Sequence, residues 1–181
     1  MTSKSELRAE MRGLRKRLAA ADPLAGERLA DHAGDLPQGA WVALYRAMGS
    51  EMDPQPLARA LLATGRTLCL PVVIERDAAM VFRAWSPGEP LEMDEAGCPA
   101  PLPLAATVIP DLIVTPLLAF DGSGGRLGQG GGYYDRTFAA LPEIARIGLA
   151  YAGQRVERLE IEAHDIRLHG VLTETGYTAF P

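Results

Sequence analysis

The chain has 181 residues, of which 48% are hydrophobic and 23% charged, and its formal net charge is -5. This composition is typical of globular proteins and predicts a single folded domain over residues 1–181, rather than a disordered or fibrous chain. The acidic balance is unfavourable for binding a phosphate backbone, so we expect no nucleic-acid partner. No apolar run is long enough to span a bilayer, and the first twenty residues are too rich in Arg, Lys and Glu for a signal peptide, so we expect a cytoplasmic protein without membrane contact.

The N-terminal segment has the pattern of an amphipathic helix. Ser3 and Glu6 match a capping box. Apolar residues follow at helical spacing, at Leu7, Met11, Leu14 and Leu18. A second helix is predicted to start at residues 22–23, with Leu24 and Leu29 directed inward, and to end before Pro37.

The central part of the chain alternates between apolar runs and one further helix. Strands are predicted at residues 41–48, 67–74 and 80–85. Between the first two, a helix starts near Asp53 and Pro54, ends at Gly65 and carries the apolar residues Leu57, Leu61 and Leu62. The proline content of residues 86–110 predicts a long irregular connection. Residues 112–120 then form an apolar run of the kind found in buried strands.

The last third continues the alternation. A helix is predicted at residues 133–141, ended by Pro142, and buried strands at residues 147–152 and 170–175. Alternating helices and buried strands are typical of α/β proteins. We therefore expect a single-domain α/β sandwich with a largely parallel central sheet flanked by helices. Cys69 and Cys98 have no metal-ligand spacing, so we expect free thiols.

The most informative stretch is residues 120–136, FDGSGGRLGQGGGYYDR, which holds seven glycines between an apolar run and a predicted helix. Such a loop lets backbone N–H groups approach an anion, and the start of the helix adds its positive end. Arg126 could contact phosphate oxygens, and the Asp135 carboxylate could hold a magnesium ion that bridges them. The pattern matches neither the P-loop nor the dinucleotide fingerprint. It favours a nucleotide triphosphate site, and the alternative is a flexible surface loop.

The run RLGQGGGYYDR, residues 126–136, closely resembles the ATP-loop signature of the 5-formyltetrahydrofolate cyclo-ligase family, RLGxGxGYYD. Lys4 and Arg8 resemble the family's nucleotide-binding Lys and Arg. The run ALYRAMGSEMD, residues 43–53, is similar to its folate-binding strand and turn, which implies that Arg46 and Glu51 contact the folate. The resemblance implies that nucleotide contacts come from Lys4, Arg8, Arg126, Leu127, Gly128, Gln129, Gly130, Gly131, Gly132, Tyr133 and Tyr134.

The closing run EAHDIRLHGVLTETG, residues 162–176, resembles the family's last segment, where an aspartate helps to bind magnesium. The resemblance therefore implies that Asp165 joins Asp135 as a ligand of Mg²⁺. Many members carry a lysine where this chain has Gly131, so neutralisation of phosphate charge falls on Lys4, Arg8 and Arg126.

The activity that the resemblance implies is the ATP-dependent cyclisation of 5-formyltetrahydrofolate to 5,10-methenyltetrahydrofolate, with release of ADP and phosphate. The formyl oxygen would attack the γ-phosphate, and N10 would then close the five-membered ring on the activated carbon. Arg126 and Tyr134 would serve this reaction as catalytic residues, with ATP and Mg²⁺ as cofactors. We expect a monomer whose partners are small molecules.

Several of these residues also have a simpler interpretation. Lys4 and Arg8 could lie on a solvated helix face, Glu51 could cap the helix that starts near Asp53, and one of the two tyrosines could pack in the core. Met48, Phe82 and Trp85 could line the folate rings or belong to the core, and we assign them no role. Two rival functions are a sugar-phosphate isomerase or CoA transferase on a similar sheet, and a regulatory protein that binds nucleotide or folate without turnover.

Overall fold

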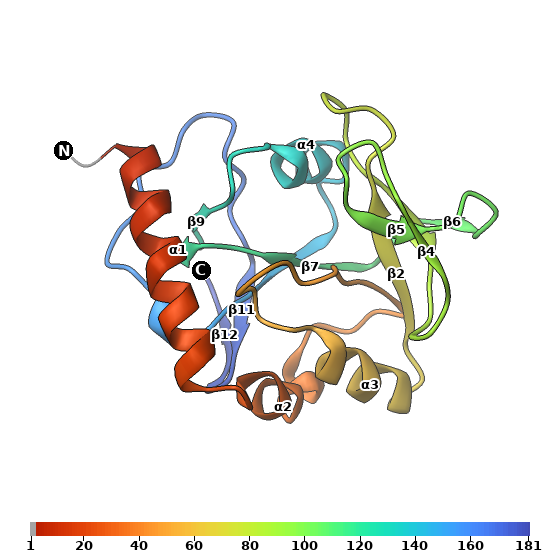
Figure 1. The fold of residues 1–181 in the computed structure, drawn as a ribbon, viewed down its shortest axis with the longest axis horizontal. Helices are drawn as coiled ribbons and strands as arrows, with labels where there is room; N and C mark the ends of the chain where they lie inside the picture. Colours follow the sequence, from red (N-terminus) through yellow and green to blue (C-terminus); the bar gives the residue numbers. More distant parts are fainter. Residues whose placement is uncertain (1–2) are drawn as a thin grey trace.

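A computed structural model describes residues 3–181 and contains a central eight-stranded sheet in the order β12-β11-β10-β7-β1-β2-β3-β6 (Figure 1). The strands are β1 (Trp41–Ala43), β2 (Thr67–Val72), β3 (Val81–Ala84), β6 (Thr107–Val108), β7 (Leu112–Pro116), β10 (Ala145–Leu149), β11 (Gly170–Thr173) and β12 (Gly176–Ala179). The neighbouring pairs from β11 to β2 are all parallel, whereas β12, β3 and β6 pair antiparallel at the two edges. The prediction of a largely parallel sheet is confirmed.

Helices cover both faces of this sheet, as Figure 1 shows. The helices α2 (Ala25–Ala30) and α3 (Gln55–Ala63) and the 3-10 turn η1 (Ala33–Asp35) lie on one face, and α4 (Tyr133–Ala140) lies on the other. Alternate strand residues therefore pack into separate cores: Val42, Leu68 and Leu112 face the α2–α3 side, whereas Ala43, Cys69 and Ile113 face Phe138 of α4. Burial on both faces explains why these strands have continuous apolar runs.

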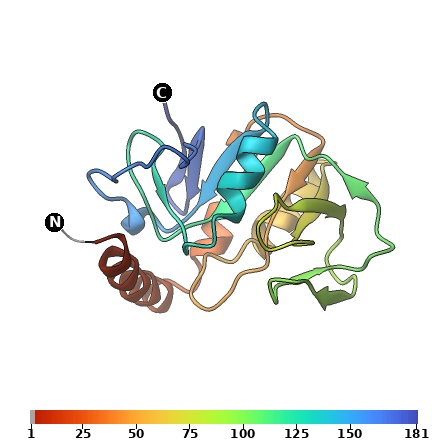
Figure 2. The same cartoon turned by 90° about the horizontal axis from the view of Figure 1, so that it is seen from above.

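The long helix α1 (Lys4–Ala21) lies to one side of the sheet rather than on a face (Figures 1 and 2). Its predicted capping box is present, because Ser3 and Glu6 exchange hydrogen bonds between side chain and backbone. Met11 is buried against a small hairpin of β8 (Ala119–Phe120) and β9 (Arg126–Leu127), with Leu118 and Leu127 in contact. Across residues 3–181, no helix is both long and apolar enough to cross a membrane.

The strands predicted at 41–48 and 112–120 differ most from the structure. The strand expected at 41–48 ends at Ala43. Beyond it the chain folds back into a turn, in which the Tyr45 hydroxyl donates to the Met52 carbonyl and Gly49 has a positive φ of 60°. The run 112–120 is divided into β7 and β8, because Pro116 has no N–H for the sheet and ends β7.

Other expectations were wrong in part. The segment 86–110 is not irregular throughout: β4 (Leu91–Met93) pairs with β5 (Pro99–Pro101), and β6 adds to the sheet edge. The expected second helix is split into α2 and η1, and Leu24 lies just before α2 with 64% of its surface exposed. The prediction for 170–175 missed that the chain turns back at Gly176 to form β12.

The strand order reverses at β1, since β2 follows on one side of it and β7 on the other. At such a point the loops that leave the carboxyl ends of neighbouring parallel strands diverge and leave a crevice. Residues at or just beyond the carboxyl ends of β1, β2 and β7 meet there, among them Tyr45, Val73 and Pro116.

Candidate active site

A cavity of 640 Å³ opens at this crevice, and every residue that the sequence assigned to the site lines it. These residues are Lys4, Arg8, Arg46, Glu51, Arg126, Leu127, Gly128, Gln129, Gly130, Gly131, Gly132, Tyr133, Tyr134, Asp135 and Asp165. They come from α1, the loop after β1, the β9–α4 segment and the segment before β11. The structure thus brings together residues up to 161 positions apart in the chain, such as Lys4 and Asp165, which form a hydrogen bond.

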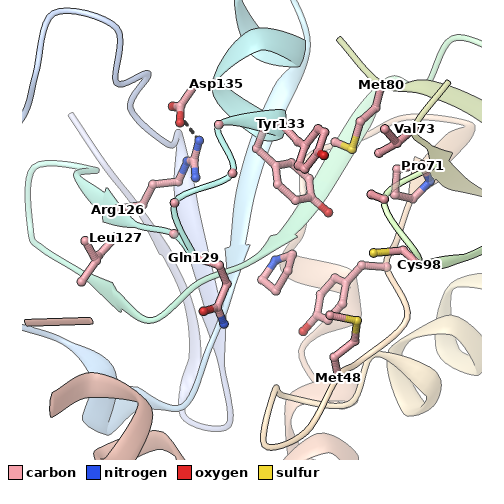
Figure 3. Close-up of a pocket in the computed structure, with 18 of the residues that line it drawn as sticks. Met48, Pro71, Val73, Met80, Cys98, Arg126, Leu127, Gln129, Tyr133 and Asp135 are labelled. Carbon is pink, nitrogen blue, oxygen red and sulfur yellow. Dashed lines mark hydrogen bonds and ion pairs between the residues drawn. The ribbon is translucent and has the colours of Figure 1, made fainter. Parts of the chain in front are cut away.

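The glycine loop connects β9 to α4 along one wall of the cavity (Figure 3). Gly130 and Gly132 have φ angles of 101° and 69°, in the region that side chains disfavour. Gly132 is the N-cap of α4, so the loop ends where the positive end of the helix and its unpaired N–H groups begin. The local geometry suits an anion.

Asp121 holds the hairpin from which the loop starts. Its carboxylate is buried and accepts hydrogen bonds from Ser123, from the Gly125 N–H at 3.0 Å and from the Leu159 N–H at 2.9 Å. Burial opposes the charge, but these donors outweigh it and lower the pKa of Asp121. Asp121 therefore fixes the β8–β9 hairpin and, through it, the position of Arg126.

The Arg126 side chain is only 6% exposed and donates from Nη2 to the Asp135 Oδ1 at 2.6 Å, as Figure 3 shows. Its guanidinium also lies over the ring of Phe138, 5.3 Å from the centroid. Within the described part of the chain, the Arg126 Nε is buried without a hydrogen-bond partner. A buried donor left unpaired is costly. Asp135 and the Phe138 ring thus hold the Arg126 guanidinium at the wall of the cavity.

Lys4 and Arg8 point into the same end of the cavity and do not lie on a solvated helix face. Lys4 Nζ lies 2.7 Å from Glu162 and 3.0 Å from Asp165, and Arg8 Nε donates to the Gly128 carbonyl at 3.0 Å. Partial burial works against the ammonium charge, but the two carboxylates outweigh it and raise the pKa of Lys4. The first turns of α1 thus contact both the glycine loop and the segment before β11.

Asp135 and Asp165 are linked through the backbone, because Asp135 Oδ1 also accepts from the N–H of Ile166 at 3.1 Å. Within residues 3–181, no cluster of three or more His, Cys, Asp or Glu side chains is arranged to hold a metal. Each aspartate is instead paired with a cation, Arg126 or Lys4. Mg²⁺ commonly takes one or two carboxylates together with substrate phosphates, and two aspartates beside an anion loop fit that requirement.

Glu51 lies in the other half of the cavity and does not cap a helix. The helix α3 starts after Pro54, where Asp53 accepts from the Gln55 N–H at 3.0 Å, so the capping interpretation of Glu51 is wrong. Glu51 Oε2 accepts from the Met48 N–H at 3.0 Å, and Oε1 lies 3.6 Å from Nη1 of Arg15. Burial of the carboxylate is the main cause that raises the pKa of Glu51.

Apolar side chains line this half of the cavity, opposite the Arg126–Asp135 pair in Figure 3. They include Met48, Pro71, Val73, Met80 and Cys98. Met48 is thus a wall residue, whereas Phe82 and Trp85 belong to the buried cores. Arg46 lies over the Trp85 ring, 5.8 Å from its centroid, and borders the cavity.

The two tyrosines at the start of α4 have different surroundings. Tyr133 lines the cavity and carries the Arg136 guanidinium over its ring at 4.9 Å. Tyr134 packs against Phe138, with ring centroids 5.9 Å apart, and burial raises the pKa of its hydroxyl well above the usual value. The Tyr134 hydroxyl is therefore neutral at physiological pH and can act as a donor.

Sequence reasoning missed Arg15, which is 5% exposed on the inner side of α1 and contacts Glu51. Helical spacing puts Arg15 on the same face as Lys4, eleven positions earlier, but a shared face alone does not separate a buried site residue from a solvated one. Val73, Met80 and Cys98 gave no such signal, since their place in the cavity depends on how β2, β3 and β5 pair.

Comparisons with known proteins identify the family of the chain. Residues 1–174 match the model of the 5-formyltetrahydrofolate cyclo-ligase family. The chain is 32% identical over 180 residues to 5-formyltetrahydrofolate cyclo-ligase from Haemophilus influenzae, covering 93% of this chain and 96% of the relative. It is 36% identical over 139 residues to the protein of the same name from Escherichia coli, covering 73% and 76% of the two chains.

The solved structure of 5,10-methenyltetrahydrofolate synthetase from Aquifex aeolicus superimposes with a TM-score of 0.80 at 31% identity, over 97% of this chain and 92% of that one. Sequence and fold therefore lead to one conclusion. The chain belongs to the 5-formyltetrahydrofolate cyclo-ligase family.

Proposed function

We propose that this protein converts 5-formyltetrahydrofolate and ATP to 5,10-methenyltetrahydrofolate, ADP and phosphate. The observation that supports this proposal best is the cavity with two unlike halves. One half, which we call the phosphate half, has a glycine loop, a helix start and the cations Lys4, Arg8 and Arg126, which suit a triphosphate. The other half, which we call the folate half, is mainly apolar and holds the buried carboxylate of Glu51, which suits flat rings that carry N–H donors.

The chemistry requires both halves. The formyl group on N5 is an amide, and its oxygen is a poor leaving group. In the proposed reaction, the formyl oxygen attacks the γ-phosphorus and the bond to ADP breaks. N10 then forms a bond to the formyl carbon and loses its proton, and the C–O bond breaks so that the phosphorylated oxygen leaves as phosphate and the methenyl bridge remains. The chain's own contribution is alignment and neutralisation of charge.

Each half has a defined task in this scheme. Arg126 would contact the transferring phosphoryl group with its positive charge. Tyr134 would donate from its neutral hydroxyl. Glu51 and Arg46 would orient the folate. Mg²⁺, held by Asp135 and Asp165 together with phosphate oxygens, would neutralise charge on the triphosphate. We also propose that the protein is a cytoplasmic monomer whose partners are these small molecules.

The direct test is an assay with the purified protein, ATP, magnesium and 5-formyltetrahydrofolate. We expect the methenyl product, followed by its absorbance, with one ADP formed for each product. The matched control is Arg126→Met, in which the side chain keeps much of its length but loses its charge, and which should form little product. No product above a boiled-protein background would contradict the proposal, and tight binding of both ligands without ADP would indicate a regulatory protein instead.

A further inference from the structure

Arg15 contacts the cavity wall from α1 and has no part in the reaction as described so far. Its guanidinium donates from Nε to the Ser50 hydroxyl at 3.2 Å and from Nη1 to the Leu117 carbonyl at 3.3 Å. The same Nη1 lies 3.6 Å from Glu51 Oε1. One side chain therefore connects α1, the turn after β1 and the chain just beyond β7.

Both members of this ion pair are withdrawn from solvent. The side chains of Arg15 and Glu51 are 6% and 7% exposed. A charge removed from water is costly unless an opposite charge or a hydrogen bond accompanies it. Glu51 has the Met48 N–H, which binds only one of its two oxygens, and the positive charge of Arg15. The neutral Gln129 side chain also lowers the pKa of Glu51, but it brings no charge.

We propose that Arg15 is a positioning residue for the folate half of the cavity, where it keeps the Glu51 carboxylate ionised and correctly oriented. The inference rests on the proposed function, because it assumes that Glu51 accepts hydrogen bonds from the folate. Arg15 acts through Glu51: the cavity is lined by Glu51 but not by Arg15.

The other groups that face Glu51 cannot replace Arg15. They are Tyr45 from the turn after β1, Cys98 from the β4–β5 hairpin, and Tyr134 and Gln129 from the loop–α4 segment. Burial raises the pKa of both tyrosine hydroxyls and of the Cys98 thiol, so these groups are neutral at pH 5–8. Among these neighbours of Glu51, Arg15 alone carries a positive charge.

The sign of the effect follows from these contacts. Burial raises the pKa of Glu51, and the positive charge of Arg15 opposes that rise. Without Arg15 the carboxylate would bind its proton at a higher pH, and its ability to accept hydrogen bonds would be lost there. The acid limit of folate binding should therefore move to higher pH.

The first test needs no substrate. The NMR signal of the Glu51 carboxyl carbon is followed in a pH titration of the wild-type protein and of Arg15→Met. The signal is identified by its absence from the spectrum of Glu51→Gln. We expect its midpoint to rise by about one to three pH units in Arg15→Met, as for loss of an opposite charge within about 4–6 Å. The control Arg17→Met removes an exposed arginine of the same helix and should leave the midpoint unchanged. An equal midpoint in Arg15→Met would overturn the inference.

Arg15→Lys keeps the test decisive if Arg15→Met does not fold. Lysine retains the charge, so the Glu51 midpoint should stay near that of the wild type. It cannot reproduce the fork that holds Ser50, Leu117 and Glu51 together, so folate binding should still weaken several-fold. Wild-type folate binding in a folded Arg15→Lys protein would refute the orienting role.

The second test is calorimetric titration with 5-formyltetrahydrofolate alone at several pH values. In Arg15→Met we expect folate binding to weaken by about tenfold at neutral pH, because protonated Glu51 loses its charged hydrogen bond with the folate. Binding should recover in part as the pH rises and Glu51 ionises. Binding equal to that of the wild type at every pH would overturn this inference alone. A wild-type protein that binds no folate would instead overturn the proposed function, and with it the role of Arg15 in folate binding.

Discussion

At the scale of single residues, three of the carboxylates assigned to the site are each paired with a cation. Arg126 is paired with Asp135, Lys4 with Asp165 and Glu162, and Arg15 with Glu51. A phosphate ligand would compete with the carboxylates for the first two cations, and a magnesium ion would compete with the cations for the carboxylates. The effect of a substitution therefore depends on the partner that it leaves behind.

Asp135→Asn tests the metal at this scale. A neutral amide is a weaker ligand for Mg²⁺ than a carboxylate, and it also leaves Arg126 without its ionic partner. We expect half-maximal activity at a higher magnesium concentration and a lower kcat, measured by magnesium titration of the cyclisation assay. Asp31→Asn, an exposed aspartate next to α2, is the matched control. An unchanged magnesium titration in folded Asp135→Asn would remove this residue from the proposed metal site.

Glu51→Gln tests folate recognition separately from phosphate chemistry. The amide keeps the size of the side chain but loses the charge, and it leaves Arg15 buried without an ionic partner. We expect weaker binding of 5-formyltetrahydrofolate, by about 1.5–3 kcal/mol for a hydrogen bond to a charged group, with ATP affinity near that of the wild type. Two calorimetric titrations of the same folded variant measure this. Equal losses for both ligands would indicate general damage to the cavity instead.

At the scale of elements, α1 is held to the body partly by apolar contacts and partly by its basic side chains. Met11 packs on the β8–β9 hairpin, while Arg8 and Arg12 donate to Gly128 and Gln129 of the glycine loop. The outer side of the helix, with Lys16 and Arg17, is exposed. The same helix therefore offers basic residues inside the cavity and matched basic residues outside it.

This arrangement predicts different ATP affinities for two double variants of α1. Lys4→Gln with Arg8→Gln should weaken ATP binding by about 1–3 kcal/mol for each charged hydrogen bond to phosphate that is removed, because both residues lie in the phosphate half. Lys16→Gln with Arg17→Gln removes the same charge from the outer side and should leave ATP affinity unchanged. ATP titrations of the two proteins decide the matter. Equal affinities in the two variants would return Lys4 and Arg8 to a structural role.

At the scale of the whole molecule, the sequence predicted the parallel sheet and most of the phosphate half, but little of the folate half. The phosphate half is largely local: Arg126 through Asp135 form one continuous segment, and the glycines of its loop identify it. The folate half is assembled from Met48, Val73, Met80 and Cys98, which come together only through strand pairing. Apolar residues of this kind have the same pattern in a core and in a cavity wall, so periodicity cannot separate them.

The helix α1 links the two halves of the cavity thermodynamically. Lys4 and Arg8 contact the phosphate half, and Arg15, on the same rigid helix, contacts Glu51 in the folate half. Fixing the position of α1 costs conformational entropy. If the nucleotide has already fixed it, folate binding no longer includes that cost, and by linkage the bound folate favours nucleotide binding by an equal free energy. We therefore expect positive cooperativity between the two ligands. A non-hydrolysable ATP analogue should tighten folate binding, and the folate should tighten binding of the analogue by the same factor. In Arg15→Met that factor should fall towards one.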